Sequence, residues 1–161
     1  MQAVSLTDRQ EIRLNSSSPL ETFAIGRKIA GFLLPGSSVA LKGTLGSGKT
    51  ELAKGIASGL GITENMTSPT YTIVNEYAFK RAAKEAVFFH IDVYRLNSEK
   101  DFEDIGGDEI LNSGGICVIE WSDRILNLLP PDCINVSIEI TGDTSRSIRI
   151  TGEKIHEFTC D

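Results

Sequence analysis

The residues best suited to chemistry lie in one glycine-rich stretch, residues 43–50 (GTLGSGKT), which fits the pattern G-x-x-x-x-G-K-[ST]. A phosphate needs a concave run of backbone N–H donors and a helix N-terminus aimed at its oxygens, and glycines let the backbone come that close. In this pattern Lys49 reaches the β- and γ-phosphates and the Thr50 hydroxyl binds Mg²⁺. The stretch therefore predicts a site for Mg-ATP or Mg-GTP.

A strand before this loop and a helix after it must hold it in place. Residues 38–42 (SVALK) have the pattern of a short buried strand, and residues 50–58 (TELAKGIAS) that of a helix with Leu52, Ala53 and Ile56 on one face. Strand, loop and helix come in the required order. These flanks favour a phosphate site over the alternative of a glycine-rich turn without a ligand.

Two carboxylates, Asp92 and Glu120, each end an apolar strand. In open α/β folds, ligands bind at the carboxyl edge of the sheet, so either side chain could hold Mg²⁺ or orient an attacking water. An acid at a strand end is often only solvated, but a phosphate loop requires an acidic partner for its metal. The strand of Glu120 is the most continuously apolar, and we expect it to be the most central, which favours Glu120 as the metal-side acid.

A hydroxyl-rich loop, residues 66–72, follows the phosphate-loop helix and contains Ser68-Pro69-Thr70. It is either a plain strand-entry turn or the loop that senses the γ-phosphate and its metal. We expect a strand over 71–79 with Tyr71, Ile73, Tyr77 and Phe79 on one face, a charged turn over 80–85, and a returning strand over 86–92. His90 is in phase with Asp92, and such a histidine is more often packed or hydrogen-bonded than catalytic.

The remaining elements surround this site. An edge strand is expected over 11–14, and a capping box at Ser18 begins a helix that runs through Leu33. The turn over 16–22 either only leads into that helix or also closes over the nucleotide base. Short helices are expected over 98–106, 108–111 and 122–129, and a hairpin over 133–140 and 145–151. Trp121 either covers the end of the core or docks a partner or the nucleotide, and Arg95 pairs with a sheet carboxylate or a partner protein.

Composition limits the class of protein. A chain of 161 residues with 40% hydrophobic residues predicts one domain over 1–161. The net charge of −6 and the pI of about 5.0 provide no basic field for a nucleic acid, so any RNA must be carried by another protein. Cys117, Cys133 and Cys160 suggest neither a disulfide framework nor a zinc site, and no signal peptide or membrane span is evident, so we expect a cytoplasmic protein.

Four motifs together resemble one family. The order L-x-G-x-L-G-x-G-K-T, T-S-P-T-Y-T-I-V-N-E-Y, H-I-D-V-Y-R-L and I-E-W is similar to the TsaE (YjeE) family, small bacterial P-loop ATPases needed for threonylcarbamoyl adenosine in tRNA. The resemblance runs from Ser18 to about Leu129, and the final hairpin carries little of it. It implies an α/β, P-loop NTPase-like three-layer fold with a mostly parallel central sheet and antiparallel edge hairpins. It also implies slow ATP hydrolysis stimulated by the proteins TsaB and TsaD, which link the chain indirectly to tRNA.

The resemblance assigns roles to residues. It implies catalytic roles for Lys49, Asp92, Glu120 and Thr70, and Mg²⁺ binding by Thr50 and Glu120. The implied ATP-binding residues are Leu45, Gly46, Ser47, Gly48, Lys49, Thr50 and Glu51. The chain departs from the family at Thr44, where Asp is usual, and at Ser47, where Ala is common. The missing acid at Thr44 could alter metal or partner contacts.

Two other functions remain open. A small-molecule P-loop kinase has a similar length and the same loop, but it needs a lid and arginines that neutralise the transferred phosphoryl group. Arg81, Arg95 and Arg124 are scattered, and no arginine-dense lid is evident. A nucleotide-dependent binding module that barely hydrolyses ATP is the third possibility.

Overall fold

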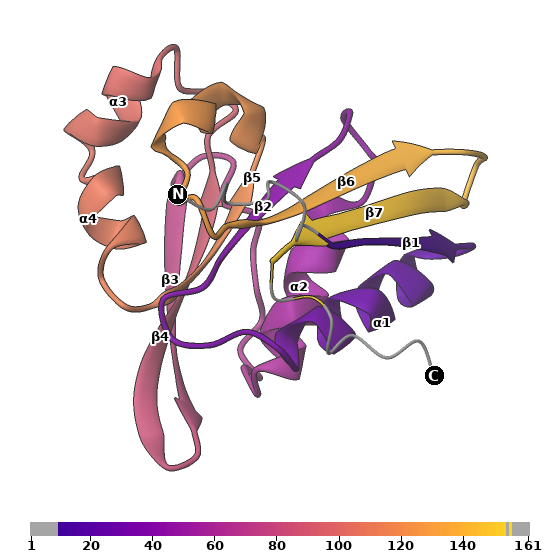
Figure 1. The fold of residues 1–161 in the computed structure, drawn as a ribbon, viewed down its shortest axis with the longest axis horizontal. Helices are drawn as coiled ribbons and strands as arrows, with labels where there is room; N and C mark the ends of the chain where they lie inside the picture. The colour runs from indigo at the N-terminus through magenta and orange to yellow at the C-terminus, as the bar shows by residue number, and fades with distance from the viewer. Residues whose placement is uncertain (1–9, 154, 156–161) are drawn as a thin grey trace, which may run out of the picture.

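One seven-stranded sheet organises the chain in the computed structural model, which describes residues 10–153 and 155 (Figure 1). The strand order is β1-β7-β6-β2-β5-β4-β3. The strands are β1 (Gln10–Ser16), β2 (Ser38–Lys42), β3 (Val74–Arg81), β4 (Lys84–Asp92), β5 (Ile116–Glu120), β6 (Ile134–Ile140) and β7 (Arg146–Gly152). Strands β6, β2, β5 and β4 are parallel, whereas β7 and β1 on one side and β3 on the other are antiparallel to their neighbours. The predicted fold class is confirmed.

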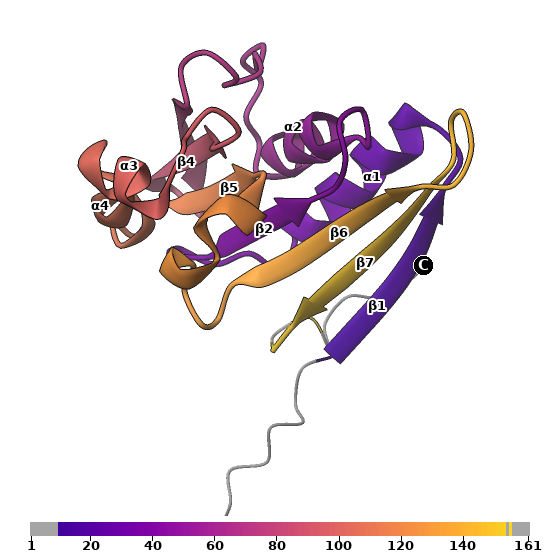
Figure 2. The same ribbon diagram turned by 90° about the horizontal axis from the view of Figure 1, so that it is seen from above.

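Helices cover both faces of this sheet (Figure 2). The helices α1 (Pro19–Ala30) and α2 (Lys49–Gly59) pack on one face, where Ile29, Leu52 and Val136 belong to the larger apolar cluster. The short helices α3 (Glu99–Asp104), α4 (Gly107–Leu111) and the 3-10 helix η1 (Ser122–Leu128) pack on the other. Alternate residues of β4 and β5 enter the two clusters, as the period of a strand requires. The result is three layers.

Helices α1 and α2 touch backbone to backbone. A Cβ added at Gly55 would lie 2.1 Å from the Phe23 carbonyl oxygen, and one added at Gly26 would lie 2.3 Å from the Leu52 carbonyl oxygen. The α1 N-terminus is capped as predicted, since Ser18 Oγ accepts from the Glu21 amide at 3.1 Å. Helix α1 ends at Ala30, short of the predicted Leu33. The close contact fixes α2, and with it the loop that precedes α2.

The β3–β4 hairpin differs from its prediction at both ends. Strand β3 begins at Val74 instead of residue 71, because Ile73 adopts a left-handed φ of 67°. Tyr71 lies in the preceding turn with 81% of its surface exposed, so its predicted place in the strand, on one face with Tyr77 and Phe79, was wrong. The expected six-residue turn is a two-residue one, Ala82-Ala83, with φ values of 50° and 63°.

The structure also bears on the predicted central strand, the helix over 122–129, the cysteines and the question of a membrane-spanning helix. The middle strand of the sheet is β2, and the strand of Glu120, β5, lies beside it instead of at the centre. The segment 122–129, expected as a helix, forms the 3-10 helix η1 over Ser122–Leu128, with non-helical dihedrals at Ile125. Cys117 has a free, buried thiol and Cys133 is also buried, whereas Cys160 lies outside the described residues. Among the described residues, no helix has the length and apolar character needed to cross a membrane.

Candidate functional site

The phosphate loop joins β2 to α2 in the predicted order. Gly46 and Gly48 have φ values of 77° and 108°, a left-handed conformation that glycine adopts without steric strain. Lys49 Nζ donates to the carbonyl oxygens of Gly43 at 2.7 Å and of Thr44 at 3.0 Å. Burial lowers the pKa of Lys49, while the charges of Glu120, Asp92 and Asp123 act to raise it. A buried cation is therefore placed at the base of the loop.

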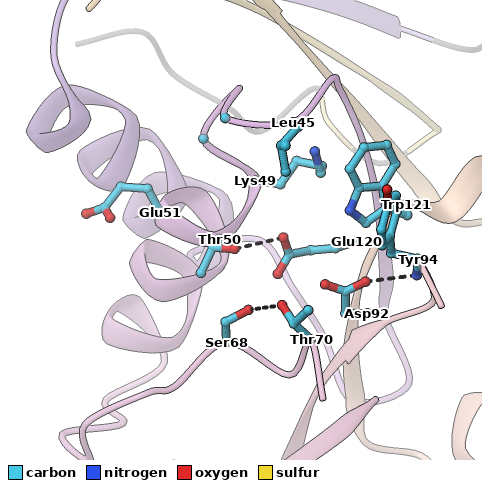
Figure 3. Close-up of a pocket in the computed structure, with 12 residues that line it drawn as sticks. Leu45, Lys49, Thr50, Glu51, Ser68, Thr70, Asp92, Tyr94, Glu120 and Trp121 are labelled. Atoms are coloured by element: carbon cyan, nitrogen blue, oxygen red, sulfur yellow. Dashed lines mark hydrogen bonds between the residues drawn. The ribbon is translucent and has the colours of Figure 1, made fainter. Parts of the chain in front are cut away.

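A cavity of about 320 Å³ opens at the carboxyl edge of the sheet (Figure 3). Six of the seven proposed nucleotide-binding residues line it, together with Thr70, Asp92 and Glu120. Ser47 is the exception, because this residue of the loop is fully buried. The carboxylate of Glu51 points away from Glu120 (Figure 3). The structure thus gathers residues from four separate segments of the sequence into one site.

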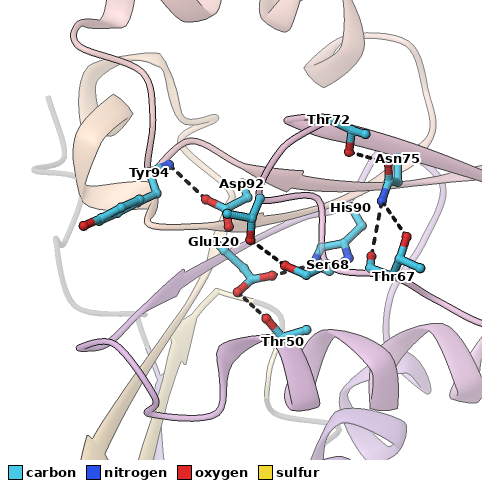
Figure 4. Close-up of polar contacts among 10 residues, drawn as sticks. Thr50, Thr67, Ser68, Thr72, Asn75, His90, Asp92, Tyr94 and Glu120 are labelled. Carbon is cyan, nitrogen blue, oxygen red and sulfur yellow. Dashed lines mark hydrogen bonds and ion pairs between the residues drawn. The ribbon is translucent and has the colours of Figure 1, made fainter.

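The two acids face each other across neighbouring strands, since Asp92 of β4 is in register with Glu120 of β5. Thr50 Oγ1 donates to Glu120 Oε1 at 2.9 Å, and Asp92 Oδ1 accepts from the Tyr94 amide at 2.9 Å (Figure 4). Both carboxylates are almost fully buried. Burial raises the pKa of Asp92, the nearby Glu120 charge raises it further, and the Tyr94 hydrogen bond lowers it.

The oxygens of Thr50 and Glu120 fit the preference of Mg²⁺ for hard oxygen ligands. No group of three or more His, Cys, Asp or Glu side chains that could hold a metal occurs among the residues that the structure describes. An ion at this position therefore needs phosphate oxygens or water to complete its shell. The donor set suits a magnesium ion that arrives with a nucleotide.

His90 is fully buried on β4, and its Nε2 lies 2.6 Å from Glu120 Oε2. Its Nδ1 has no hydrogen-bond partner among the described residues. The packed or hydrogen-bonded interpretation of His90 is the one that the structure supports. The alternation of His90 with Asp92 indicated a shared strand face, but only the pairing of β4 with β5 brings the imidazole to Glu120.

The hydroxyl-rich loop lies across the cavity from the phosphate loop. Ser68 Oγ and Thr70 Oγ1 are hydrogen-bonded at 2.7 Å. The Ile73 carbonyl accepts from the Asp92 amide at 2.8 Å. Asn75 Nδ2 donates to the Thr67 carbonyl at 3.2 Å (Figure 4). These bonds hold the loop against the end of β4, with Thr70 on the cavity side.

Aromatic rings close one side of the cavity. Trp121 has a left-handed φ of 60°, and Lys49 Nζ lies 4.0 Å from the centre of its indole ring. The Tyr94 ring is 4.7 Å from Trp121. Trp121 also packs on the second apolar cluster, so it both covers the core and faces the cavity. The Arg95 guanidinium lies 4.3 Å from the Tyr71 ring, an interaction that the sequence did not indicate.

Arg146 is a residue that the sequence analysis missed. Its Nε donates to the Ser47 carbonyl at 2.9 Å and its Nη2 to the Gly46 carbonyl at 3.1 Å. About a hundred residues separate it from the phosphate loop in the chain. No local signal marks it, because the contact depends on the pairing of β6 with both β2 and β7.

Fold and site together define an α/β protein that carries a phosphate-loop motif between the middle strand of its sheet and a covering helix. The family model described as "Threonylcarbamoyl adenosine biosynthesis protein TsaE" matches residues 16–148. The chain belongs to the TsaE family. The resemblance drawn from the motifs is confirmed, and the match extends beyond Leu129 into the final hairpin.

Related proteins are similar in sequence over most of the chain. The tRNA threonylcarbamoyladenosine biosynthesis protein TsaE of Bacillus subtilis (strain 168) is 39% identical over 156 residues, covering 94% of this chain and 93% of that protein. The protein of the same name from Treponema pallidum (strain Nichols) is 40% identical over 139 residues, covering 86% and 99%. The crystal structure of Bacillus subtilis YdiB superposes with a TM-score of 0.72 at 34% identity, covering 89% of this chain and 86% of that one.

Proposed function

We propose that this chain binds ATP with Mg²⁺, hydrolyses it slowly, and thereby supports a TsaB–TsaD complex in the threonylcarbamoyl adenosine modification of tRNA in the cytoplasm. The observation that carries the proposal is the convergence of Lys49, Thr50 and Glu120 in one cavity, with Thr50 bonded directly to Glu120. Membership of the TsaE family supports the pathway.

Each side chain has a role that its position supports. Lys49 pairs with the β- and γ-phosphate oxygens, and Thr50 with Glu120 holds the magnesium ion. Bound Mg²⁺ neutralises charge on those phosphates. Asp92, whose pKa burial raises, lies beside Glu120 and orients the attacking water, and Thr70 senses the terminal phosphate from the opposite loop. The residues proposed for binding and for catalysis therefore line one cavity.

A small-molecule P-loop kinase is the weaker alternative. Kinases stabilise the transferred phosphoryl group with arginines, and no arginine is among the described residues that line this cavity. Arg95 and Arg124 lie instead over the rings of Tyr71 and Tyr94. Phosphorylated products from a panel of small acceptors would favour the kinase.

ATP turnover by the purified chain, alone and with TsaB and TsaD, tests the proposal. Lys49→Ala should weaken ATP binding by about tenfold to a hundredfold, because the phosphate loses a charged donor. Glu120→Ala should spare binding more than hydrolysis. Lys54→Ala on the same helix and Glu109→Ala on α4 are the charge-matched controls. Equal rates for wild type, Lys49→Ala and Glu120→Ala in the presence of partners would show that the site is misassigned.

A further inference from the structure

We propose that Arg146, at the start of β7, is a positioning residue that orients the phosphate-binding amides of the loop 43–50. The proposal rests on the proposed function, because it concerns the same phosphate site. Arg146 contacts the back of the loop through carbonyl oxygens and does not line the cavity. It would therefore act on a bound nucleotide only through the backbone of the loop.

The guanidinium joins two loops that are far apart in sequence. On one side, Nε and Nη2 donate to the carbonyls of Ser47 and Gly46 at 2.9 and 3.1 Å. On the other side, Nη1 donates to the carbonyls of Gly142 and Ser145 at 3.1 and 2.8 Å. The planar fork of arginine offers five N–H donors in fixed directions, and no lysine can reproduce this pattern.

Peptide geometry converts these bonds into an effect on the phosphate side. In a trans peptide the C=O and N–H vectors point in opposite directions, and the described residues contain no cis peptide. Because Arg146 holds the Ser47 carbonyl, the Gly48 amide of the same peptide must point away from Arg146. Arg146 also holds the Gly46 carbonyl, so the Ser47 amide of that peptide points away from Arg146 as well. This amide donates to the Thr44 carbonyl at 3.1 Å. Arg146 thus fixes the orientation of two successive peptides in the loop.

The neighbouring strand supports the same loop at a second point. A Cβ on Gly43 would lie 2.8 Å from the Ile138 carbonyl oxygen of β6, so the start of the loop rests directly on that strand. Between this contact and Arg146, the glycines at 46 and 48 adopt their left-handed dihedrals. Glycine is conformationally free, so an external contact is needed to hold one arrangement of amides before a phosphate binds.

The affinities for Mg-ADP and Mg-ATP, measured by titration calorimetry on the full-length protein, test this role. Arg146→Ala should weaken ADP and ATP binding by a similar factor of at least about tenfold, because the amides hold the phosphates that both share. Arg146→Lys should fall between this variant and wild type. Arg149→Ala is the matched control, since Arg149 lies on the same strand and its side chain forms, among the residues that the structure describes, a single 4.0 Å ion pair with Glu11 at the surface.

Two readouts separate positioning from general stability. Without nucleotide, Arg146→Ala should have a lower thermal midpoint than Arg149→Ala, because it loses four hydrogen bonds. Its ADP affinity should nevertheless be reduced at temperatures where the variant is fully folded, and millimolar guanidinium should restore part of that affinity. If folded Arg146→Ala or Arg146→Lys binds ADP as tightly as Arg149→Ala, the role of Arg146 is overturned while the proposed function stands. A wild-type protein that binds no nucleotide, even with TsaB and TsaD, would instead remove the proposed function and this inference with it.

Discussion

The Glu120 carboxylate divides its two oxygens between two partners, Thr50 and His90. Removing the imidazole leaves one oxygen of a buried acid without its donor, and such a loss typically costs about 1–3 kcal/mol. We expect His90→Phe to lower the free energy of unfolding by about that amount and to reduce ATP turnover more than ATP affinity. Denaturant titration and steady-state kinetics measure the two effects.

Ser38 provides the control for His90 because its buried hydroxyl has no hydrogen-bond partner among the described residues. Ser38→Ala removes an unsatisfied polar group and should leave stability unchanged or raise it slightly. Both positions lie in the parallel centre of the sheet. If His90→Phe were as stable and as active as Ser38→Ala, the hydrogen bond between His90 and Glu120 would contribute neither to stability nor to ATP turnover.

Cys117 makes the stability of the fold depend on pH in the alkaline range. Burial raises the pKa of this thiol from 9.0 to about 12, with a smaller contribution from Cys133. Above pH 9 the unfolded chain releases a proton that the folded chain retains, so stability is full below about pH 9 and falls as pH rises towards 12. Between about pH 8 and about pH 10, wild type should lose about 1 kcal/mol more than Cys117→Ala in denaturant titrations. Parallel pH curves for the two proteins would contradict this.

Among the elements, the β3–β4 hairpin contains an unfavourable turn. Ala82 and Ala83 both have positive φ, as a type I′ turn requires, and at such positions glycine or asparagine is preferred. Ala83→Gly should therefore raise the free energy of unfolding by about 0.5–1 kcal/mol. The same substitution at the exposed helical residue Ala24 should lower it by about 1 kcal/mol. Equal signs for the two changes in thermal unfolding would show that the turn is not strained.

This hairpin also shows how far sequence patterns reach. Alternating apolar residues predicted both strands, but Ala-Ala is no turn signal, so the turn was placed over six residues instead of two. The N-cap at Ser18 was predicted correctly because its hydrogen bond is local, whereas the Glu21 carboxylate accepts from the Ser17 amide instead of the Ser18 amide that a capping box requires. The phosphate loop, Thr70 and the two strand-end acids could be singled out as candidates for the same reason, since each has a local pattern, and the structure places them around one cavity. His90 on Glu120 and Arg146 on Ser47 join distant segments, so only strand order and register place them.

Over the whole molecule, the phosphate loop lies between the two antiparallel edges of the sheet, at the end of its middle strand. It follows the middle strand, β2, whose neighbours are β5 with its acid on one side and β6 on the other. Helix α2, which follows the loop, packs in the larger apolar cluster. Trp121, whose ring lies 4.0 Å from Lys49 Nζ, packs on the second cluster. The loop is therefore adjacent to elements that pack on both faces of the sheet.

The charge of the whole chain determines how it can meet RNA. Its net charge is −6, and Glu103, Asp104, Asp108 and Glu109 are exposed on α3 and α4. Because phosphate contacts supply most non-specific affinity, we expect the isolated protein to bind tRNA more weakly than about 10⁻⁴ M at physiological salt. Fluorescence anisotropy with labelled tRNA measures this, first with the chain alone and then with TsaB and TsaD.

A variant with those four acids changed to Gln or Asn should gain weak tRNA affinity at low salt and lose it again as salt rises. Such behaviour would show that repulsion by this face contributes to excluding RNA from the isolated protein. Submicromolar, strongly salt-dependent tRNA binding by the unmodified chain alone would mean that a local basic surface outweighs the net charge. The chain would then contact tRNA directly instead of through its partners.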